Sequence, residues 1–229
     1  MTFDLEGILW LVSVWALPVV TAITLHEAAH GWVAWKLGDD TAQRMGRVTF
    51  NPLKHIDRFG TILLPCLLLL FQAPFLFGYA RPVPVRFHRL GRPRRDMVLV
   101  AAAGPAINLL MALAAALAFH LVVLVPDVAS AWLAANLRNA LIINVVLAVF
   151  NMLPLPPLDG GRVVTGLLPA RLAARFQRVE RYGIAILVAL IAVPPLIGEQ
   201  IGMDISILSH LLLPPVEAII HAIVSVAMV

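Results

Sequence analysis

Three ionisable side chains lie within a hydrophobic run near the N-terminus, in the stretch HEAAH at residues 26–30. His26 and His30 are four residues apart, so a helix would place both imidazoles on one face, one turn from each other. Two imidazoles at that spacing can bind one zinc ion, and Glu27 can take a proton from a water at the metal. Ionisable groups inside a membrane segment are rare and are by default functional. The pattern therefore favours metal-assisted hydrolysis over a polar cluster that only packs helices together.

A catalytic zinc site needs a third protein ligand and an open position for water. The carboxylate of Asp159, in NMLPLPPLDGGR at residues 151–162, is the best-placed candidate. A helix starting near Gly161 would instead make Asp159 an N-cap, which is a common role for Asp. The residues alone leave these two roles equally open. The remaining histidines are isolated or lie in basic loops: His55, His88, His120, His210 and His221.

The composition places these residues in a membrane protein. Of the 229 residues, 61% are hydrophobic and 13% are charged, whereas soluble domains have about 45–50% apolar and about 25% charged residues. A single cysteine, Cys66, excludes an internal disulfide framework and a cysteine-based zinc cluster. The net charge of +4 comes from arginines clustered in loops, which set orientation and meet anionic lipid. We expect no nucleic-acid partner, because no basic, aromatic-rich soluble domain is present.

Five to six hydrophobic segments predict an all-α polytopic membrane protein. A spanning helix needs about 20 apolar residues, a length that the first, third and fourth segments reach easily. The fifth and sixth segments are shorter or are interrupted by prolines. The segments cover roughly 7–35, 61–77, 97–125, 132–153, 182–198 and 205–228.

Segment 61–77 is short, contains two prolines and lies between two basic loops, at 36–60 and 78–96. The positive-inside rule favours the cytoplasm for both loops, and a single crossing would put one of them outside. We therefore expect a re-entrant or interfacial segment near 61–85. The same rule predicts that helix 7–35 runs from the outer to the cytoplasmic side of the membrane. His30 would then lie about 9 Å, and His26 about 15 Å, below an inner interface near Lys36. The rule also places Asp159 on the same side as both histidines.

Three motifs occur in order: HEAAH at 26–30, AGPAINLL at 103–110 and NMLPLPPLDGG at 151–161. Together they resemble the site-2 protease family of intramembrane zinc metalloproteases, over about residues 20–165. The stretches GRVTFNPLKHIDRFGTILLP and FGYARPVPV are similar to the compact prokaryotic branch without a PDZ domain, for which this chain has no room. The resemblance implies one integral membrane peptidase domain over 1–229, with a three-helix catalytic core at about 7–165 and C-terminal helices at about 166–229.

The resemblance also implies roles for the candidate residues. His26, His30 and Asp159 would hold one zinc ion, and Glu27 would be the general base and acid. Asn151 matches an asparagine expected to stabilise the oxyanion, a role that suits an amide N–H donor.

The middle motif, Gly-Pro-x-x-Asn, is expected on a helix beside the site. Asn108 of this motif would either bind substrate or support the site, or form hydrogen bonds between helices, and both interpretations carry equal weight. Gly104 and Pro105 are expected to allow the helices to approach closely.

The function expected from these observations is an intramembrane zinc metalloprotease that hydrolyses peptide bonds within or near transmembrane segments of other proteins. Its partners would be transmembrane protein or peptide substrates and the lipid bilayer. Its location would be a prokaryotic inner membrane, with multiple passes and the active site near the cytoplasmic side. An extended substrate could add to an exposed strand edge near residues 79–85.

Two alternatives are a metal-binding scaffold that does not cleave and a transporter. An intact Glu27 argues against the scaffold, because ligation alone would not need that carboxylate. Transporters usually carry ionisable groups along a path through several helices, or paired broken helices in a repeat, and no repeat is evident here.

Overall fold

The computed structural model describes residues 5–70, 78–201 and 207–228. Within these ranges the regular elements are helices, with no β-strand, and the predicted all-α class is confirmed. The longer helices are α1 (Leu5–Lys36), α4 (Pro93–Ala118), α5 (Asp127–Asn151), α8 (Glu180–Ile201) and α9 (Ile207–Ala227). The shorter ones are α2 (Thr41–Arg44), α3 (Leu64–Leu70), α6 (Asp159–Leu167) and α7 (Ala170–Gln177). Further helical turns form η1 (Pro52–Lys54), η2 (Arg58–Leu63), η3 (Phe87–Arg89) and η4 (Phe119–Leu124).

Four helical stretches are long and apolar enough to cross a membrane: Leu5–Lys36, Pro93–Leu124, Asp127–Asn151 and Leu208–Ala227. Each overlaps one of the predicted hydrophobic segments, and the protein is therefore an integral membrane protein. Segment 182–198 lies within α8. Of segment 61–77, residues 61–70 belong to η2 and α3, and residues 71–77 lie outside the described residues.

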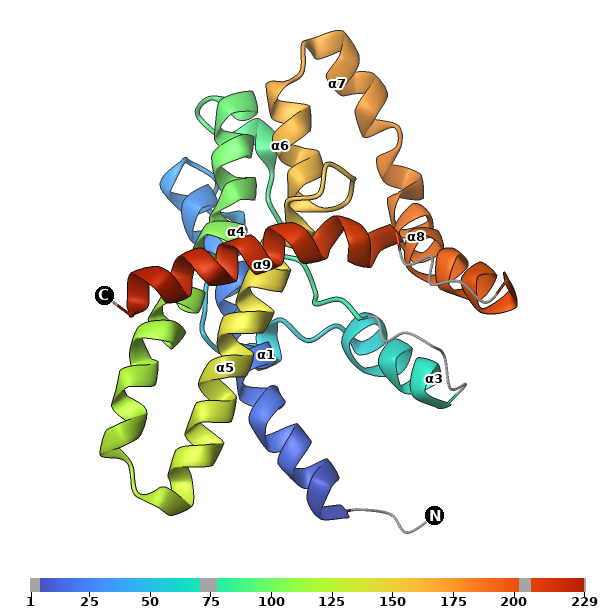
Figure 1. The fold of residues 1–229 in the computed structure, drawn as a ribbon. Coiled ribbons are helices and arrows are strands. Elements are labelled where there is room, and N and C mark those ends of the chain that lie inside the picture. The colour runs from blue at the N-terminus through green and yellow to red at the C-terminus, as the bar shows by residue number, and fades with distance from the viewer. Residues whose placement is uncertain (1–4, 71–77, 202–206, 229) are drawn as a thin grey trace.

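The helices α1, α4 and α5 pack against one another and form the core of the molecule (Figure 1). Small side chains line their contacts, and Ala22 of α1 and Ala112 of α4 have no exposed surface. Small residues let helix backbones approach closely, which favours helix association in lipid. Asn139 of α5 adds a hydrogen bond between helices, because its Nδ2 donates to the carbonyl oxygen of Val14 at 3.0 Å.

Helix α9 runs across α4 and α5 rather than alongside them (Figure 1). Its residue Val216 is buried in an apolar cluster with Ala112 and Val145. The C-terminal end of α9 is attached through His120, whose Nε2 lies 2.7 Å from the carbonyl oxygen of Ala227. His120 therefore contacts the C-terminal helix.

Residues 79–86, which we call the strap, lead from the region of α3 towards η3. They form no strand, so the strand edge expected near residues 79–85 was a wrong prediction. Pro82 and Pro84 lack the N–H groups that an edge needs for pairing. The N–H of Tyr79 and of Arg81 already donate to protein carbonyl oxygens, at 3.0 and 2.9 Å. The strap is thus hydrogen-bonded to the rest of the chain rather than to a neighbouring strand.

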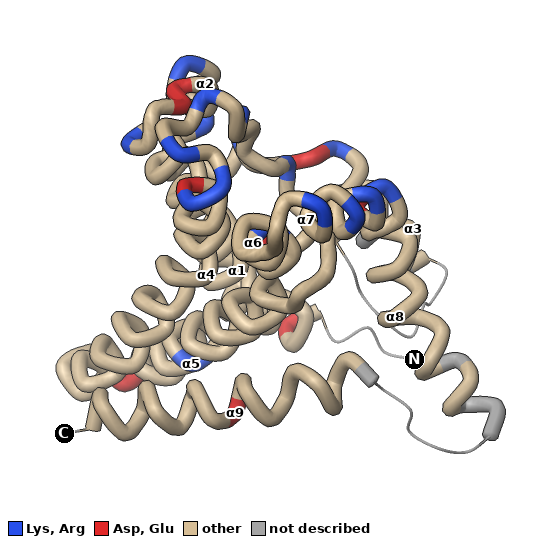
Figure 2. Tube along the Cα trace, turned by 90° about the horizontal axis from the view of Figure 1, so that it is seen from above, with Lys and Arg blue, Asp and Glu red and all other residues tan. Residues whose placement is uncertain are grey.

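Lysines and arginines gather at one end of the molecule, around α2 and along α7 to the start of α8 (Figure 2). We call this part the basic end; it includes Lys36 at the C-terminus of α1. Outside the basic end, the long helices have few charged residues, and Arg138 is the one basic residue of α5.

Candidate metal centre

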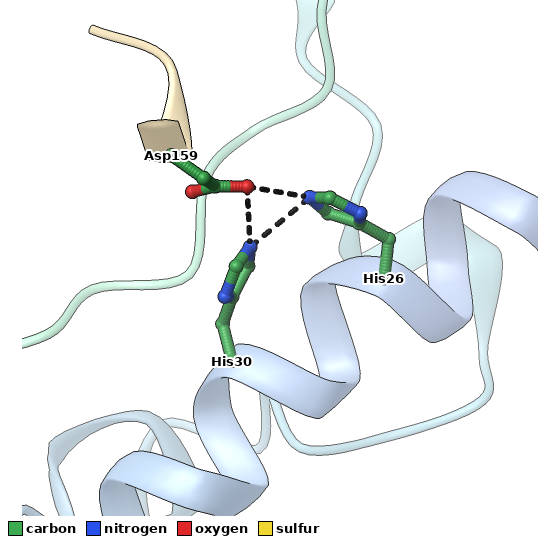
Figure 3. Close-up of side chains that lie close together, drawn as sticks. All are labelled: His26, His30 and Asp159. Atoms are coloured by element: carbon green, nitrogen blue, oxygen red, sulfur yellow. Dashed lines mark hydrogen bonds and ion pairs between the residues drawn. The ribbon is translucent and has the colours of Figure 1, made fainter. Parts of the chain in front are cut away.

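Three buried side chains converge where α1 meets the start of α6 (Figure 3). Helical periodicity brings His26 and His30 to the same face of α1, and their Nε2 atoms are 3.0 Å apart. The Oδ2 atom of Asp159 lies 3.2 Å from each of them. The three residues expose only 5–7% of their surface. The structure therefore brings together the three residues that the sequence suggested as ligands.

The loop before α6 determines where Asp159 lies. Leu158 is the N-cap of α6 and Asp159 is its first residue, so Asp159 is not the N-cap that one interpretation of the sequence required. A side chain at Gly160 would collide with the carbonyl oxygens of Met152 and Leu153, so only glycine allows this close turn. The carboxylate lies at the positive N-terminal end of the helix dipole, which favours its ionised form.

The Nδ1 atom of each histidine, which points away from the centre, has a hydrogen-bond acceptor on α4. The Nδ1 of His26 lies 2.5 Å from the Oδ1 of Asn108, and the Nδ1 of His30 lies 2.7 Å from the carbonyl oxygen of Val100. The amide oxygen of Asn108 is identified by its Nδ2, which donates to Asn144 Oδ1 at 2.7 Å and to a backbone carbonyl of α1. Because both partners can only accept, each Nδ1 carries a proton, and in the neutral imidazoles each Nε2 presents a lone pair to the centre.

These residues fit a divalent metal. Two imidazole Nε2 atoms and a carboxylate oxygen face one another at 3.0–3.2 Å, and their lone pairs would repel without a cation or a proton between them. Asp159 Oδ2 is buried and has no hydrogen-bond donor among the described residues. Zinc–nitrogen bonds of about 2.0–2.1 Å in a tetrahedron imply ligand separations of about 3.3 Å. Two histidines and one carboxylate also leave the fourth position that a catalytic zinc keeps open.

Gly104 of α4 faces this centre directly. A Cβ added there would lie 2.5 Å from His30 Nε2 and 2.5 Å from His26 Cε1, inside the space between the ligands. Glycine is therefore the residue that lets α4 approach α1 at this point. Pro105 follows it within the same helix and is also buried. It lacks the N–H that would bond to the carbonyl of Ala101, one turn earlier.

Glu27 lies between the two histidines in sequence and is half-buried. Its Oε2 accepts a hydrogen bond of 2.7 Å from the backbone N–H of Val83, in the strap. The carboxylate is thus held by a main-chain group from another segment, and it is not one of the three clustered ligands.

Asn151 is the last residue of α5, and its Nδ2 donates to the carbonyl oxygen of Leu147 in the same helix at 3.0 Å. Among the described residues, no contact joins its side chain to His26, Glu27 or Asp159. Its role as an oxyanion donor stays a prediction.

Sequence reasoning missed three groups that support the centre: Asn144, the carbonyl of Val100 and the N–H of Val83. Asn144 has no exposed surface and pairs with Asn108 across the α4–α5 contact. A polar residue inside an apolar span was the signal that could have identified it. The other two groups belong to the main chain, so residue type carries no information about them.

Known proteins resemble this chain along most of its length. A model of peptidase family M50 matches residues 120–194, a range that contains Asp159. The protein named "Putative zinc metalloprotease YwhC" from Bacillus subtilis (strain 168) is 40% identical over 185 residues, which cover 78% of this chain and 80% of that protein.

Two proteins named "Putative zinc metalloprotease Rip2" are also similar. The one from Mycolicibacterium smegmatis is 31% identical over 82% of this chain and 66% of its own length. The one from Mycobacterium tuberculosis (strain H37Rv) is 28% identical over 88% of this chain and 73% of its own length. No solved structure matches the chain.

Proposed function

The chain belongs to peptidase family M50, and we propose that it is an intramembrane zinc metalloprotease that hydrolyses peptide bonds within or near transmembrane segments of other proteins. One observation carries this proposal. Two histidines of a membrane-spanning helix and Asp159 present three ligand atoms to a single point, with the histidine tautomers set by α4. The names of the relatives, which describe zinc metalloproteases, agree with this chemistry.

The residues of the chain have distinct parts in hydrolysis. Zinc bound by His26, His30 and Asp159 would polarise the scissile carbonyl and increase the acidity of water. Glu27 takes the proton of the attacking water and later delivers it to the leaving nitrogen. The amide of Asn151 is the candidate donor to the oxyanion, once it exchanges its bond with Leu147 for one with the substrate.

The substrates we propose are transmembrane segments, because two of the three ligands, His26 and His30, belong to a helix that can span the bilayer. A substrate helix hides its carbonyl groups in hydrogen bonds, so it must unwind locally before cleavage. The other partner is the lipid bilayer, and nucleic acid has no part in this function. A scaffold that only binds metal would not require the carboxylate of Glu27 to be held in place by the strap.

We place the protein in the inner (plasma) membrane of a prokaryotic cell, with the active site near the cytoplasmic side. The support is the gathering of lysines and arginines at the basic end, since cytoplasmic loops are enriched in these residues (Figure 2). The chain is helical from His26 to Lys36, so His30 lies about 9 Å along α1 from the basic end.

The test is cleavage of a pool of transmembrane peptides by the protein in liposomes. The wild type should cut, while Glu27→Gln and the wild type with its metal chelated should both lose nearly all activity. Zinc analysis of Glu27→Gln should show bound metal, and Asp159→Ala should have lost it. Equal cleavage by all three preparations would contradict the proposal.

A further inference from the structure

The strap is attached to the protein on both sides of Val83. Before Val83, Tyr79 N–H donates to the carbonyl of Gly60 at 3.0 Å, and Arg81 N–H donates to the carbonyl of His55 at 2.9 Å. After it, Arg86 N–H donates to Oδ2 of Asp39 at 2.5 Å. Between these attachments, Val83 N–H donates to Glu27 at 2.7 Å. The position of the proposed base is therefore coupled to loops far away in sequence.

Prolines on both sides make Val83 the only possible donor in the middle of the strap. In the stretch Arg-Pro-Val-Pro, residues 82 and 84 have no N–H, so the one amide proton of residues 82–84 is directed at Glu27. A residue that precedes proline is restricted to extended backbone, and this applies to both Arg81 and Val83. The strap therefore loses little conformational entropy when it takes up its folded position against α1.

The packing of the Val83 side chain determines where the strap lies along α1. Val83 exposes 6% of its surface. A Cβ at Gly31 would lie 3.1 Å from Val83 Cγ1 and 3.0 Å from Val48 Cγ2, closer than ordinary packing. Glycine one turn after Glu27 therefore lets the strap lie directly on α1. The amide of Val83 meets Glu27 because its side chain is seated beside Gly31.

A buried arginine holds the strap from the other side. Arg47 exposes only 5% of its surface, and its Nη2 donates to the carbonyl of Arg81 at 2.6 Å and to that of Pro82 at 3.4 Å. No carboxylate among the described residues forms an ion pair with it, and its Nε has no acceptor there. The charge of Arg81 opposes the positive guanidinium, and the charge of Glu27 favours it. A buried charge without a direct ion pair is costly, and the carboxylate whose charge favours this one is the proposed base.

We infer that Arg47 is a positioning residue for Glu27: its guanidinium holds the strap so that Val83 N–H binds one oxygen of the carboxylate and directs the other at the reacting water. This inference rests on the proposed function, in which Glu27 is the base. Arg47 is not one of the three clustered ligands, and it acts through the main chain of residues 81–83. Its loss should reduce the rate of the chemical step more than substrate binding, because a base that is not oriented loses stabilisation in the transition state.

The first experiment replaces a single N–H by an oxygen. Replacing Val83 by its α-hydroxy acid analogue turns its amide into an ester, which keeps the side chain and deletes the N–H. We expect kcat to fall about 10-fold or more, with KM within about twofold and zinc content unchanged. The same replacement at Val85, whose N–H has no partner among the described residues, is the matched control and should leave kcat nearly unchanged. Equal kcat for the Val83 ester and the wild type would overturn the inference.

The second experiment changes the arginine. Arg47→Gln should reduce kcat about as much as the Val83 ester while retaining zinc, and Arg47→Lys should recover a large part of the rate because lysine can still donate to the carbonyls. Arg44→Gln is the matched control, since Arg44 is exposed and pairs with Asp40 instead of the strap. If Arg47→Lys and Arg47→Gln lost activity equally and both lost zinc, Arg47 would be a folding residue only.

A third measurement does not depend on activity. In zinc-free protein, hydrogen exchange at the Val83 amide should be at least about 10-fold faster in Arg47→Gln and in Glu27→Ala than in the wild type, and unchanged in Arg44→Gln. Identical exchange in all four proteins would refute the link even if the protease activity were established. If the wild type cleaved no substrate, the proposed function would fail, while this measurement would still decide whether Arg47 holds the strap.

Discussion

At the scale of single residues, the metal centre depends on a buried amide. Asn108 has no exposed surface and makes three hydrogen bonds, to His26, to Asn144 and to the carbonyl of Ala22. Through them it joins α1, α4 and α5 at one point and selects the tautomer of His26. Groups that orient metal ligands from behind contribute strongly to metal affinity.

Replacing Asn108 by alanine should therefore weaken zinc binding by about 10- to 100-fold. The imidazole of His26 would lose its acceptor and could rotate, or carry its proton on Nε2. Competition with a chelating dye measures the effect. Asn136→Ala is a suitable control, because the Nδ2 of Asn136 donates within its own helix, to the carbonyl of Trp132. Wild-type zinc affinity in Asn108→Ala would show that His26 does not depend on this hydrogen bond.

The residues of this site were predictable to different degrees. The spacing of His26 and His30 predicts their convergence, because a helix allows no other arrangement. The spacing does not reveal that Asp159 joins them, because its position depends on a tight loop whose backbone packs closely against Gly160 and Gly161. The sequence offered two alternatives for Asn108, supporting the site or joining helices. Asn108 does both, since it contacts His26 and Asn144 at once.

At the scale of elements, the long apolar helices could be predicted from the sequence, and the strap could not. Segments 7–35, 97–125 and 132–153 correspond to α1, α4 and α5 because hydrophobic length is visible in the sequence. The expected strand edge near 79–85 failed because hydrogen bonds to loops and side chains replace pairing with a strand. Such non-local partners have no periodic signature.

One buried carboxylate joins the end of α1 to the strap. Asp39 has no exposed surface and accepts hydrogen bonds from the hydroxyl and N–H of Thr41 and from the N–H of Arg86. Burial by itself raises the pKa of this carboxyl. The hydrogen bonds of Thr41 and Arg86, with the charge of Arg89, outweigh it, so the pKa lies below its ordinary value.

This shift predicts how stability depends on pH. A carboxyl with a lower pKa in the folded state stabilises the fold fully above its unfolded pKa of about 3.9, and this contribution is lost as pH falls through the folded value. Asp39→Asn should lower the unfolding temperature at pH 7, and the difference from the wild type should shrink below about pH 4. Thermal unfolding of both metal-free proteins in detergent measures it. A difference that stays constant down to pH 3 would contradict this role for Asp39.

At the scale of the whole molecule, charge and hydrophobicity are separated along the bundle. The basic end carries Lys36, α2 and the arginines of α7, and the opposite end is formed by the turn between η4 and α5 (Figures 1 and 2). This asymmetry was predictable, because it follows from the loop arginines alone. The crossing of α9 over α4 and α5 was not, since hydrophobic length specifies that a helix can span and not the direction in which it packs.

Accessibility of single cysteines tests the proposed orientation. Because Cys66 is the one cysteine of the chain, Cys66→Ser provides a background without thiols. Val128→Cys adds a thiol at a 98% exposed position opposite the basic end, and Arg44→Cys adds one within the basic end. If the positive loops are cytoplasmic, a membrane-impermeant maleimide should label position 128 in intact cells and position 44 only after the membrane is opened. Protease activity of each variant serves as the folding control. The reverse pattern would place His26 and His30 near the outer surface, and the source of water and the exit of the cleaved segment would then lie on that side.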